Sequence, residues 1–241
     1  MPSDQLSDRN VVITGASRGI GYAAGVACAK RGAHVIGLAR TTSGLEKLDD
    51  DIRSVGGQAT LIPVDITQEE AVSRLPAALE DRFGKIDGLI LNAGMLGPLT
   101  HVAEVLGKEW HETFTVNLHA NLAMIQLLHP LLLKSDAGRL VAVTSRAARV
   151  SKPFWGAYAA SKAALDVLVK TYAEEQAPGS VRANLLDPGP TATAMRKEAM
   201  PGEDPSTITP PEVIGERLAD MVQTDYQETA GMVVMPRPDG V

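Results

Sequence analysis

The chain has 241 residues, one cysteine, and 29 acidic against 23 basic side chains, which gives a net charge of −6. This length suits a single domain (residues 1–241), and the lone Cys28 excludes a disulfide framework and favours a reducing compartment. The acidic balance, with a pI near 5.4, argues against nucleic acid or an anionic membrane as the main partner.

The first ten residues are polar and lack the apolar core of a secretory signal. The most apolar stretch, residues 118–133, is interrupted by polar side chains and Pro130, and it is shorter than the ~20 residues that a membrane span needs. We therefore expect a soluble, cytoplasmic protein with no membrane span.

Short runs rich in Val, Ile and Leu alternate with longer helical patterns along the chain. Strands are expected at residues 10–14, 33–38, 59–64, 88–91, 139–144, 181–186 and 232–235. Helices are expected at residues 19–31, 44–55, 69–83, 108–133, 157–175 and 211–224. Repeated β-then-α units predict an α/β fold, a Rossmann-type doubly wound parallel sheet of about seven strands with helices on both faces. The proline-rich residues 188–211 predict a structureless loop, with residues 190–211 as a substrate lid or else a surface excursion.

The first strand runs directly into a glycine-rich turn, Thr14-Gly15-Ala16-Ser17-Arg18-Gly19-Ile20-Gly21. Its spacing departs from G-x-G-x-x-G, but it serves the same physics: a tight turn, close approach of the backbone to pyrophosphate, and a helix N-terminus directed at the phosphates. Because the turn lies between a strand and a helix at the first crossover, it predicts a nucleotide site rather than a plain turn.

The second strand is followed by Arg40, where an NAD site places an acidic residue that holds the ribose 2′-hydroxyl. A guanidinium there accepts a 2′-phosphate, and Arg18 can approach the same phosphate from the glycine turn. The alternative for either arginine alone is a solvated surface charge. The pair predicts NADP(H), with NAD(H) less favoured.

Two further strand ends fit the same ligand. Asp65, followed by Ile66, ends the third strand, where a carboxylate can accept from the adenine amine. Asn92, Ala93 and Gly94 follow the fourth strand, where small residues let the backbone lie close to the cofactor. Ligands of open α/β sheets bind at such strand ends.

The chemistry is predicted at Tyr158 and Lys162, which share one face of a helix at spacing i, i+4. A nearby ammonium favours the phenolate and lowers the pKa of tyrosine, which suits general acid–base work on a carbonyl or alcohol oxygen. Ser145 ends the fifth strand and can hydrogen-bond the same oxygen. Asn117 lies within a helical pattern, where asparagine is more often a solvated or helix-bending side chain.

Together these motifs resemble the compact, NADP-preferring branch of the short-chain dehydrogenase/reductase family, in order and spacing, from residue 10 to residue 241. The resemblance implies that Tyr158 exchanges the proton, that Lys162 lowers its pKa and holds the nicotinamide ribose, that Ser145 orients the substrate oxygen, and that Asn117 anchors a relay water. Within the family, residues 131–138, 155–162 and 191–196 are similar to the bacterial YciK-like oxidoreductases.

The family motif continues after the sixth strand, where residues 188–193 would pack against the nicotinamide. Asp187 departs from the neutral residue that relatives usually carry there, which puts the local hydrogen bonding in doubt. The implied cofactor-binding residues are Gly15, Ser17, Arg18, Gly19, Ile20, Gly21, Arg40, Asp65, Ile66, Asn92, Ala93, Gly94, Tyr158, Lys162, Pro188, Gly189, Thr191 and Thr193.

The predicted function is NADPH-dependent hydride transfer to or from a carbonyl or secondary alcohol, and the alternative is a catalytically silent NADP(H)-binding sensor or assembly protein. The four residues Asn117, Ser145, Tyr158 and Lys162 favour the enzyme, because a binding protein needs no acid–base group. Nucleic-acid binding lacks a basic helix and an aromatic platform. The five histidines do not cluster, so no metal is expected.

The substrate is expected to meet residues 95–101, residues 146–155 and the lid. Arg146, Arg149 and Lys152 hint at an anionic substrate, and a solvated or subunit-facing basic loop is the alternative. The family resemblance also implies a homodimer or homotetramer through the helices that contain Asn117 and Tyr158.

Overall fold

Seven short apolar runs form one parallel β-sheet in the computed structural model, which describes residues 5–236. The ends of the proposed domain, residues 1–4 and 237–241, lie outside the described residues. The strands are β1 (Asn10–Thr14), β2 (His34–Ala39), β3 (Gln58–Pro63), β4 (Gly88–Leu91), β5 (Arg139–Val143), β6 (Arg182–Asp187) and β7 (Met232–Val234). The predicted fold class is confirmed, since each expected strand is present within one residue at either end.

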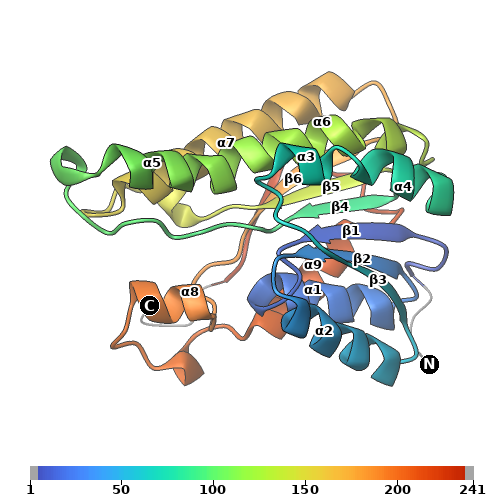
Figure 1. Cartoon of the computed structure of the whole chain (residues 1–241), viewed down its shortest axis with the longest axis horizontal. Helices are drawn as coiled ribbons and strands as arrows, with labels where there is room; N and C mark the ends of the chain where they lie inside the picture. The colour runs from blue at the N-terminus through green and yellow to red at the C-terminus, as the bar shows by residue number, and fades with distance from the viewer. Residues whose placement is uncertain (1–4, 237–241) are drawn as a thin grey trace.

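The strand order is β3-β2-β1-β4-β5-β6-β7, so the chain first builds outward from β1 and then returns to place β4 on its other side (Figure 1). The carboxyl ends of β1 and β4 therefore lie at the point where the direction of winding reverses. Open α/β sheets bind their ligands beyond the strands at such a point.

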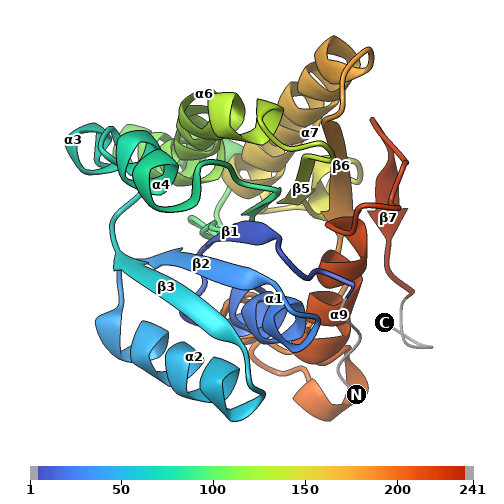
Figure 2. The same ribbon diagram turned by 90° about the vertical axis from the view of Figure 1, so that its right-hand side faces the viewer.

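Two helical layers cover the sheet (Figures 1 and 2). One layer consists of α1 (Gly19–Lys30), α2 (Thr42–Ser54) and α9 (Pro211–Met221), and the other includes α4 (Leu75–Phe83), α6 (Ala120–Leu133) and α7 (Gly156–Gln176). Successive strand residues point to opposite faces, so Val11 and Ile13 pack toward the first layer while Val12 packs toward the second. The central strands β1, β4 and β5 are buried on both faces, which explains their continuous apolar runs.

Two of the expected helices are divided. Residues 69–83 form α3 (Glu69–Val72) and then α4, because Pro76 stands in the first turn of α4, where proline starts a helix rather than continues one. Residues 108–133 form α5 (Gly107–Phe114), a π-helical turn (Thr115–His119) and α6. The π-helical turn places Asn117 at the end of the sheet where the catalytic residues are predicted.

The expectation of a structureless loop over residues 188–211 is wrong. This segment contains α8 (Ala194–Ala199) and a 3₁₀ helix (Pro205–Thr207). The hydroxyl of Thr193 accepts from the backbone N–H of Arg196 (3.2 Å) and caps α8. The N–H of Ala192 donates to the carbonyl of Thr209 (2.9 Å), which closes the segment at its base. Two more 3₁₀ helices, Val102–Glu104 and Arg146–Ala148, lie elsewhere.

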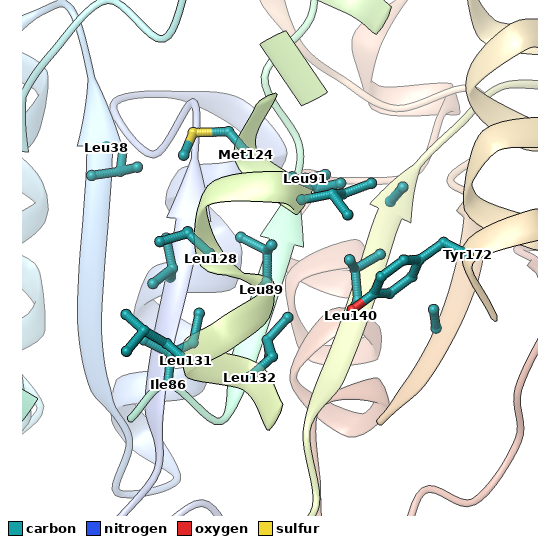
Figure 3. Packing of buried hydrophobic residues seen from close by; sticks show 14 of the residues in the cluster. Leu38, Ile86, Leu89, Leu91, Met124, Leu128, Leu131, Leu132, Leu140 and Tyr172 are labelled. Carbon is teal, nitrogen blue, oxygen red and sulfur yellow. The ribbon is translucent and has the colours of Figure 1, made fainter. Parts of the chain in front are cut away.

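The helical stretch Gly107–Leu133 is long and apolar enough to cross a membrane by length and composition. Its second half is α6, whose Met124, Leu128 and Leu132 are buried against the sheet in the core shown in Figure 3. The buried core helix of a globular fold passes the same test, so this stretch is weak evidence for a membrane span.

We expect Leu128→Ala to lower the free energy of unfolding by about 2–5 kcal/mol, because it leaves a cavity beneath α6. Val213→Ala is the control, since Val213 on α9 is 46% exposed and its truncation should change stability by less than about 0.5 kcal/mol. Urea unfolding followed by circular dichroism measures both, and equal losses in the two variants would contradict this description of the core.

Candidate active site

The glycine-rich turn after β1 presents a backbone surface and a helix N-terminus. Gly15 and Gly19 adopt left-handed φ angles of +69° and +58°, which glycine reaches at no steric cost. A Cβ on Gly21 would collide with the side chain of Asn92 and the carbonyl of Gly15. Arg18 occupies the N-cap position of α1 but makes no capping side-chain hydrogen bond. The first N–H groups of α1 are thus left to an anion, as a dinucleotide pyrophosphate requires.

Thr14 and Asn92 tie this turn to the end of β4. The Thr14 hydroxyl accepts from the backbone N–H groups of Asn92 and Ala93, both at 3.0 Å. The Asn92 amide donates to the carbonyls of Thr14 (3.0 Å) and Gly15 (3.2 Å). The side chain of Asn92 therefore fixes the conformation of the glycine-rich turn. The sequence pattern alone did not indicate this role.

The loops after β2 and β3 carry the charges expected near the adenosine. The side chain of Arg40 is 72% exposed, and its guanidinium lies 3.9 Å from Oδ2 of Asp65. Oδ1 of Asp65 accepts from the N–H (3.0 Å) and hydroxyl (2.7 Å) of Thr67. Burial works against this carboxylate, but the bonds from Thr67 and the charge of Arg40 outweigh burial and lower the pKa of Asp65. Arg18 is also exposed, on the loop after the neighbouring strand β1.

The remaining expected cofactor residues lie around the same edge. Ser17 packs against the start of α2, since a Cβ on Gly44 would stand 2.6 Å from its carbonyl oxygen. Ile20 is half-buried behind the turn, and Ile66 is buried. Thr193, on the segment after β6, also lies against the glycine-rich turn, because a Cβ on Gly19 would be 3.3 Å from the methyl group of Thr193.

The segment after β6 begins with Pro188 and with Gly189 at a left-handed φ of +65°. Thr191 is buried, and its hydroxyl donates to the carbonyls of Pro188 and Gly189, both at 3.3 Å. From here the chain continues into α8, which extends past the same end of the sheet as α5 (Figure 1). The structure thus brings both ends of the predicted cofactor site together.

Lys162 on α7 is a buried ammonium group, since the residue is only 4% exposed. Its Nζ donates to the carbonyl of Val143 at the end of β5 (2.8 Å) and lies 6.0 Å from the ring centroid of Tyr158. Burial lowers the pKa of Lys162 to about 8, against the opposing charge of Asp166. The spacing of Tyr158 and Lys162 therefore does place both groups on one buried face.

The pKa of Tyr158 differs from the expectation. Burial raises the pKa of its phenol to about 12, the negative charge of Asp187 also raises it, and a hydrogen bond with Ser145 lowers it. In the protein by itself, the loss of water around the phenolate outweighs any favourable effect of Lys162. The Ser145 hydroxyl also accepts from the N–H of Ala147 (3.2 Å), which fixes its position after β5.

Asn117 is buried in the π-helical turn rather than on a solvated face. Its amide bonds both backbone groups of Met95, accepting from the N–H (2.8 Å) and donating to the carbonyl (2.9 Å), and it donates to the hydroxyl of Ser161 (3.0 Å). Ser161 in turn donates to the carbonyl of Tyr158 (2.8 Å). Asn117 thus links the loop after β4 to α7, and π-helical turns are frequent at functional sites.

Sequence reasoning missed Ser161 and Asn121, which support Asn117. The Asn121 amide donates to the carbonyl of Asn117 (2.8 Å) across the π-helical turn. The i, i+4 spacing of the two asparagines, and the position of Ser161 directly before Lys162, were the available signals.

The expected substrate-contacting segments meet beside Tyr158. The edge of the Trp155 ring packs on Tyr158 with centroids 5.8 Å apart, and Phe154 contacts His101 in the same manner at 4.8 Å. Nζ of Lys152 lies 4.8 Å from the Trp155 centroid and 3.7 Å from the sulfur of Met200. The segment that follows β6 therefore contacts the loop that precedes α7.

The segment 146–155 contains three basic residues, and each has different surroundings. Arg146 is exposed and Lys152 lies on Trp155, whereas Arg149 forms ion pairs with Asp187 and with Asp166 (3.6 Å). The doubt about hydrogen bonding at Asp187 is resolved, since this buried carboxylate also accepts from the N–H of Gly189 (3.1 Å). Within residues 5–236, no group of three or more His, Cys, Asp or Glu side chains is arranged to hold a metal ion.

Comparison with known proteins identifies the class. Residues 9–204 match the family model described as short chain dehydrogenase, so the chain belongs to the short-chain dehydrogenase/reductase family of oxidoreductases. Among its relatives, the oxidoreductase YciK of Escherichia coli K12 is 35% identical over 238 residues, which cover 98% of this chain and 94% of YciK. The 2,3-dihydro-2,3-dihydroxybenzoate dehydrogenase of Bacillus subtilis is 34% identical, with 81% of this chain and 75% of that enzyme covered.

Solved structures agree with this assignment. A short chain dehydrogenase from Shigella flexneri 2a, complexed with NADP, has a TM-score of 0.92 at 34% identity, covering 96% of this chain and 98% of that one. A short chain dehydrogenase from Escherichia coli CFT073, complexed with NADPH, has a TM-score of 0.91 at 35% identity with the same coverage. The predicted family resemblance is confirmed, including its likeness to YciK.

Burial of Lys162 predicts a distinctive pH dependence of stability in the cofactor-free protein. Between pH 8 and 10 the unfolded lysine stays protonated while the folded one, with a pKa of about 8, loses its proton. Unfolding then takes up a proton, so stability rises with pH, by on the order of 2 kcal/mol. Below pH 8, Lys162 is protonated in both the folded and the unfolded protein, so the full free-energy cost of burying its charge remains.

The difference in unfolding free energy between wild type and Lys162→Met isolates this effect, because contributions from other groups cancel. Urea unfolding at pH 8 and pH 10 should show the wild type gaining relative to the variant. Above pH 10 the raised pKa of Tyr158 acts in the opposite direction, so the comparison stops there. A difference that is constant between the two pH values would contradict the burial of a charged Lys162.

Proposed function

We propose that the protein is an NADPH-dependent oxidoreductase that transfers hydride between nicotinamide and a carbonyl or secondary alcohol substrate. The observation that carries the proposal is the buried Tyr158–Lys162 pair, with Ser145 bonded to the phenol, at the same edge of the sheet as the glycine-rich turn. A protein that only binds a nucleotide has no need of a buried phenol and ammonium at this edge.

The cofactor preference is supported from two directions. The exposed Arg40 and Arg18 follow neighbouring strands at the position where the adenosine ribose is expected, and no acidic residue directly follows β2. Two solved structures similar to this chain hold NADP and NADPH. The glycine-rich turn and the N-terminus of α1 would hold the pyrophosphate, and Oδ2 of Asp65 would accept from the adenine amine.

In the proposed reduction, the bound cofactor supplies the hydride to the carbonyl carbon. Tyr158 donates its proton to the carbonyl oxygen, and the Ser145 hydroxyl orients that oxygen. A phenol with a pKa of about 12 is protonated at neutral pH, which is the form that reduction requires. Lys162, whose pKa is lowered to about 8, is still mostly protonated there and can return a proton toward Tyr158.

Asn117 positions this group of residues rather than touching substrate. Through Met95 and Ser161 it fixes the loop after β4 against the first turns of α7. The proposed role in anchoring a relay water would fall to the backbone of the same π-helical turn. The proposed catalytic groups are therefore Ser145, Tyr158 and Lys162, with Asn117 as the residue that positions them.

A homodimer or homotetramer and a cytoplasmic location stay predictions. The proposed subunit contact through the helices that contain Asn117 and Tyr158 is supported by exposed apolar side chains. Leu106 and Trp110 lie at and within α5, and Val167 lies on the outer face of α7.

We expect Tyr158→Phe to lower turnover by about 10²–10⁴-fold, the usual worth of one positioned acid–base group, while NADPH binding changes little. Tyr172→Phe is the matched control, because Tyr172 is also buried on α7 but bonds His129 (2.9 Å) away from the site. The loss of NADPH absorbance with aldehydes, ketones, quinones and keto-acids measures turnover. A Tyr158→Phe enzyme as active as wild type would refute the role of Tyr158. Tight NADPH binding by wild type without turnover of any compound would favour the alternative, a catalytically silent NADP(H)-binding sensor or assembly protein.

We expect Arg40→Ala to weaken NADPH binding by about 10- to 150-fold, since a charge-assisted hydrogen bond contributes about 1.5–3 kcal/mol, and to leave NADH binding nearly unchanged. Arg53→Ala removes the same charge from a side chain that is equally exposed (73%, against 72% for Arg40) and serves as the control. Fluorescence titration gives both dissociation constants. Equal losses for the two cofactors would show that Arg40 does not read the 2′-phosphate.

A further inference from the structure

A buried carboxylate lies directly behind the candidate catalytic residues. Asp187 is the last residue of β6 and is only 2% exposed. Its neighbour Leu186 accepts from the N–H of Thr144 (2.8 Å), so Asp187 stands beside the end of β5, close to the residue that precedes Ser145. One carboxylate oxygen accepts from the N–H of Gly189 (3.1 Å), and the other pairs with Arg149.

A second carboxylate approaches the same guanidinium from α7. Asp166 lies one turn beyond Lys162, is buried, and accepts from the hydroxyl of Thr144. Its Oδ2 is 3.6 Å from one terminal nitrogen of Arg149, while the other terminal nitrogen bonds Asp187. The planar guanidinium, whose side chain is 34% exposed, thus bridges the end of β6 and the middle of α7, with one terminal nitrogen directed at each carboxylate.

This bridge is part of the electrostatic surroundings of Tyr158. In the part of the chain that the structure describes, the charged groups around the phenol are Lys162 and Asp166 from α7, Asp187 from β6, Arg149 from the loop after β5, and Lys152 over the adjoining Trp155 ring. The charge of Asp187 acts on Tyr158 and that of Asp166 acts on Lys162. Arg149 is the cation that both carboxylates contact.

We propose that Arg149 is a positioning residue for the chemistry at Tyr158: it neutralises the buried carboxylate of Asp187 and fixes Asp187 and Asp166 behind the Tyr158–Lys162 pair. The inference rests on the proposed function only for its catalytic consequence. The charge of Arg149 is already shared between two carboxylates, which weakens its attraction for an anionic substrate.

Substitution of Arg149 and substitution of Asp187 should change the pKa of Tyr158 in opposite directions. Without Arg149, the Asp187 carboxylate loses its ion-pair partner, which disfavours the phenolate of Tyr158. With Asp187→Asn, the guanidinium remains while the carboxylate charge is gone, which favours the phenolate. The double variant Arg149→Met/Asp187→Asn loses both charges and returns Tyr158 toward its wild-type behaviour.

Titration of Tyr158 in the cofactor-free protein tests this without any turnover. The ¹³Cζ resonances of labelled tyrosine are followed to alkaline pH, and the Tyr158 signal is identified by its absence from Tyr158→Phe. We expect the midpoint to fall by about one pH unit in Asp187→Asn, from a wild-type value of about 12. In Arg149→Met the signal should remain that of the phenol throughout, and the double variant should titrate near wild type.

Arg146→Met is the matched control, because it removes an exposed arginine from the same loop and should leave the Tyr158 midpoint unchanged. If Arg149→Met fails to fold, Asp187→Asn still decides the question, since it is nearly isosteric and retains Arg149. A midpoint unchanged in Asp187→Asn, or lowered equally by Arg146→Met, would overturn the inference.

The pH profile of alcohol oxidation with NADP⁺ then connects the bridge to catalysis. Oxidation requires the phenolate, so the acidic limb of kcat/KM should move to lower pH in Asp187→Asn and to higher pH in Arg149→Met, with Arg149→Lys between Arg149→Met and wild type. If the Tyr158 resonance shifts as expected but wild type oxidises no alcohol, the proposed function fails while the charge bridge stands. If wild type is active and the limb moves in neither Arg149→Met nor Asp187→Asn, Arg149 has no positioning role.

Discussion

The burial of the Lys162 ammonium group is the constraint on which the candidate site depends. A charge that is almost removed from water must be surrounded by acceptors and permitted by small neighbours. The carbonyl of Val143 supplies the direct bond, and a Cβ on Gly94 would stand only 3.5 Å from Nζ and 3.2 Å from the amide oxygen of Asn117. The ends of β4 and β5, the π-helical turn and α7 are therefore shaped around one side chain.

The same burial separates the two titrating groups of the site. It lowers the pKa of Lys162 and raises that of Tyr158, because the charged form of each is the one that loses water. The protein by itself holds a phenol beside an ammonium, and the charges of Asp187 and Asp166 add to the effect of burial or oppose it. Arg149 matters in this arrangement because it faces both Asp166 and Asp187.

Local patterns predicted the sheet and the glycine-rich turn well, since buried parallel strands and helix N-termini leave short-range signals in the chain. Features made by distant contacts were not predicted. The π-helical turn at Asn117 depends on Met95 and Ser161, and α8 depends on a cap and on closure by Thr209. Motifs placed Tyr158 and Lys162 together, but the pKa of Tyr158 depends on burial and on Asp187, which spacing does not reveal.

Transfer of deuterium from C4-deuterated NADPH to a carbonyl compound is the most direct test that this site performs hydride transfer. Wild type is incubated with the labelled cofactor and a carbonyl compound, and the alcohol formed is examined by mass spectrometry. We predict one deuterium on the carbinol carbon, and almost none of that alcohol with Tyr158→Phe. Tight binding of NADPH with no labelled alcohol from any aldehyde, ketone or keto-acid would contradict the proposed chemistry.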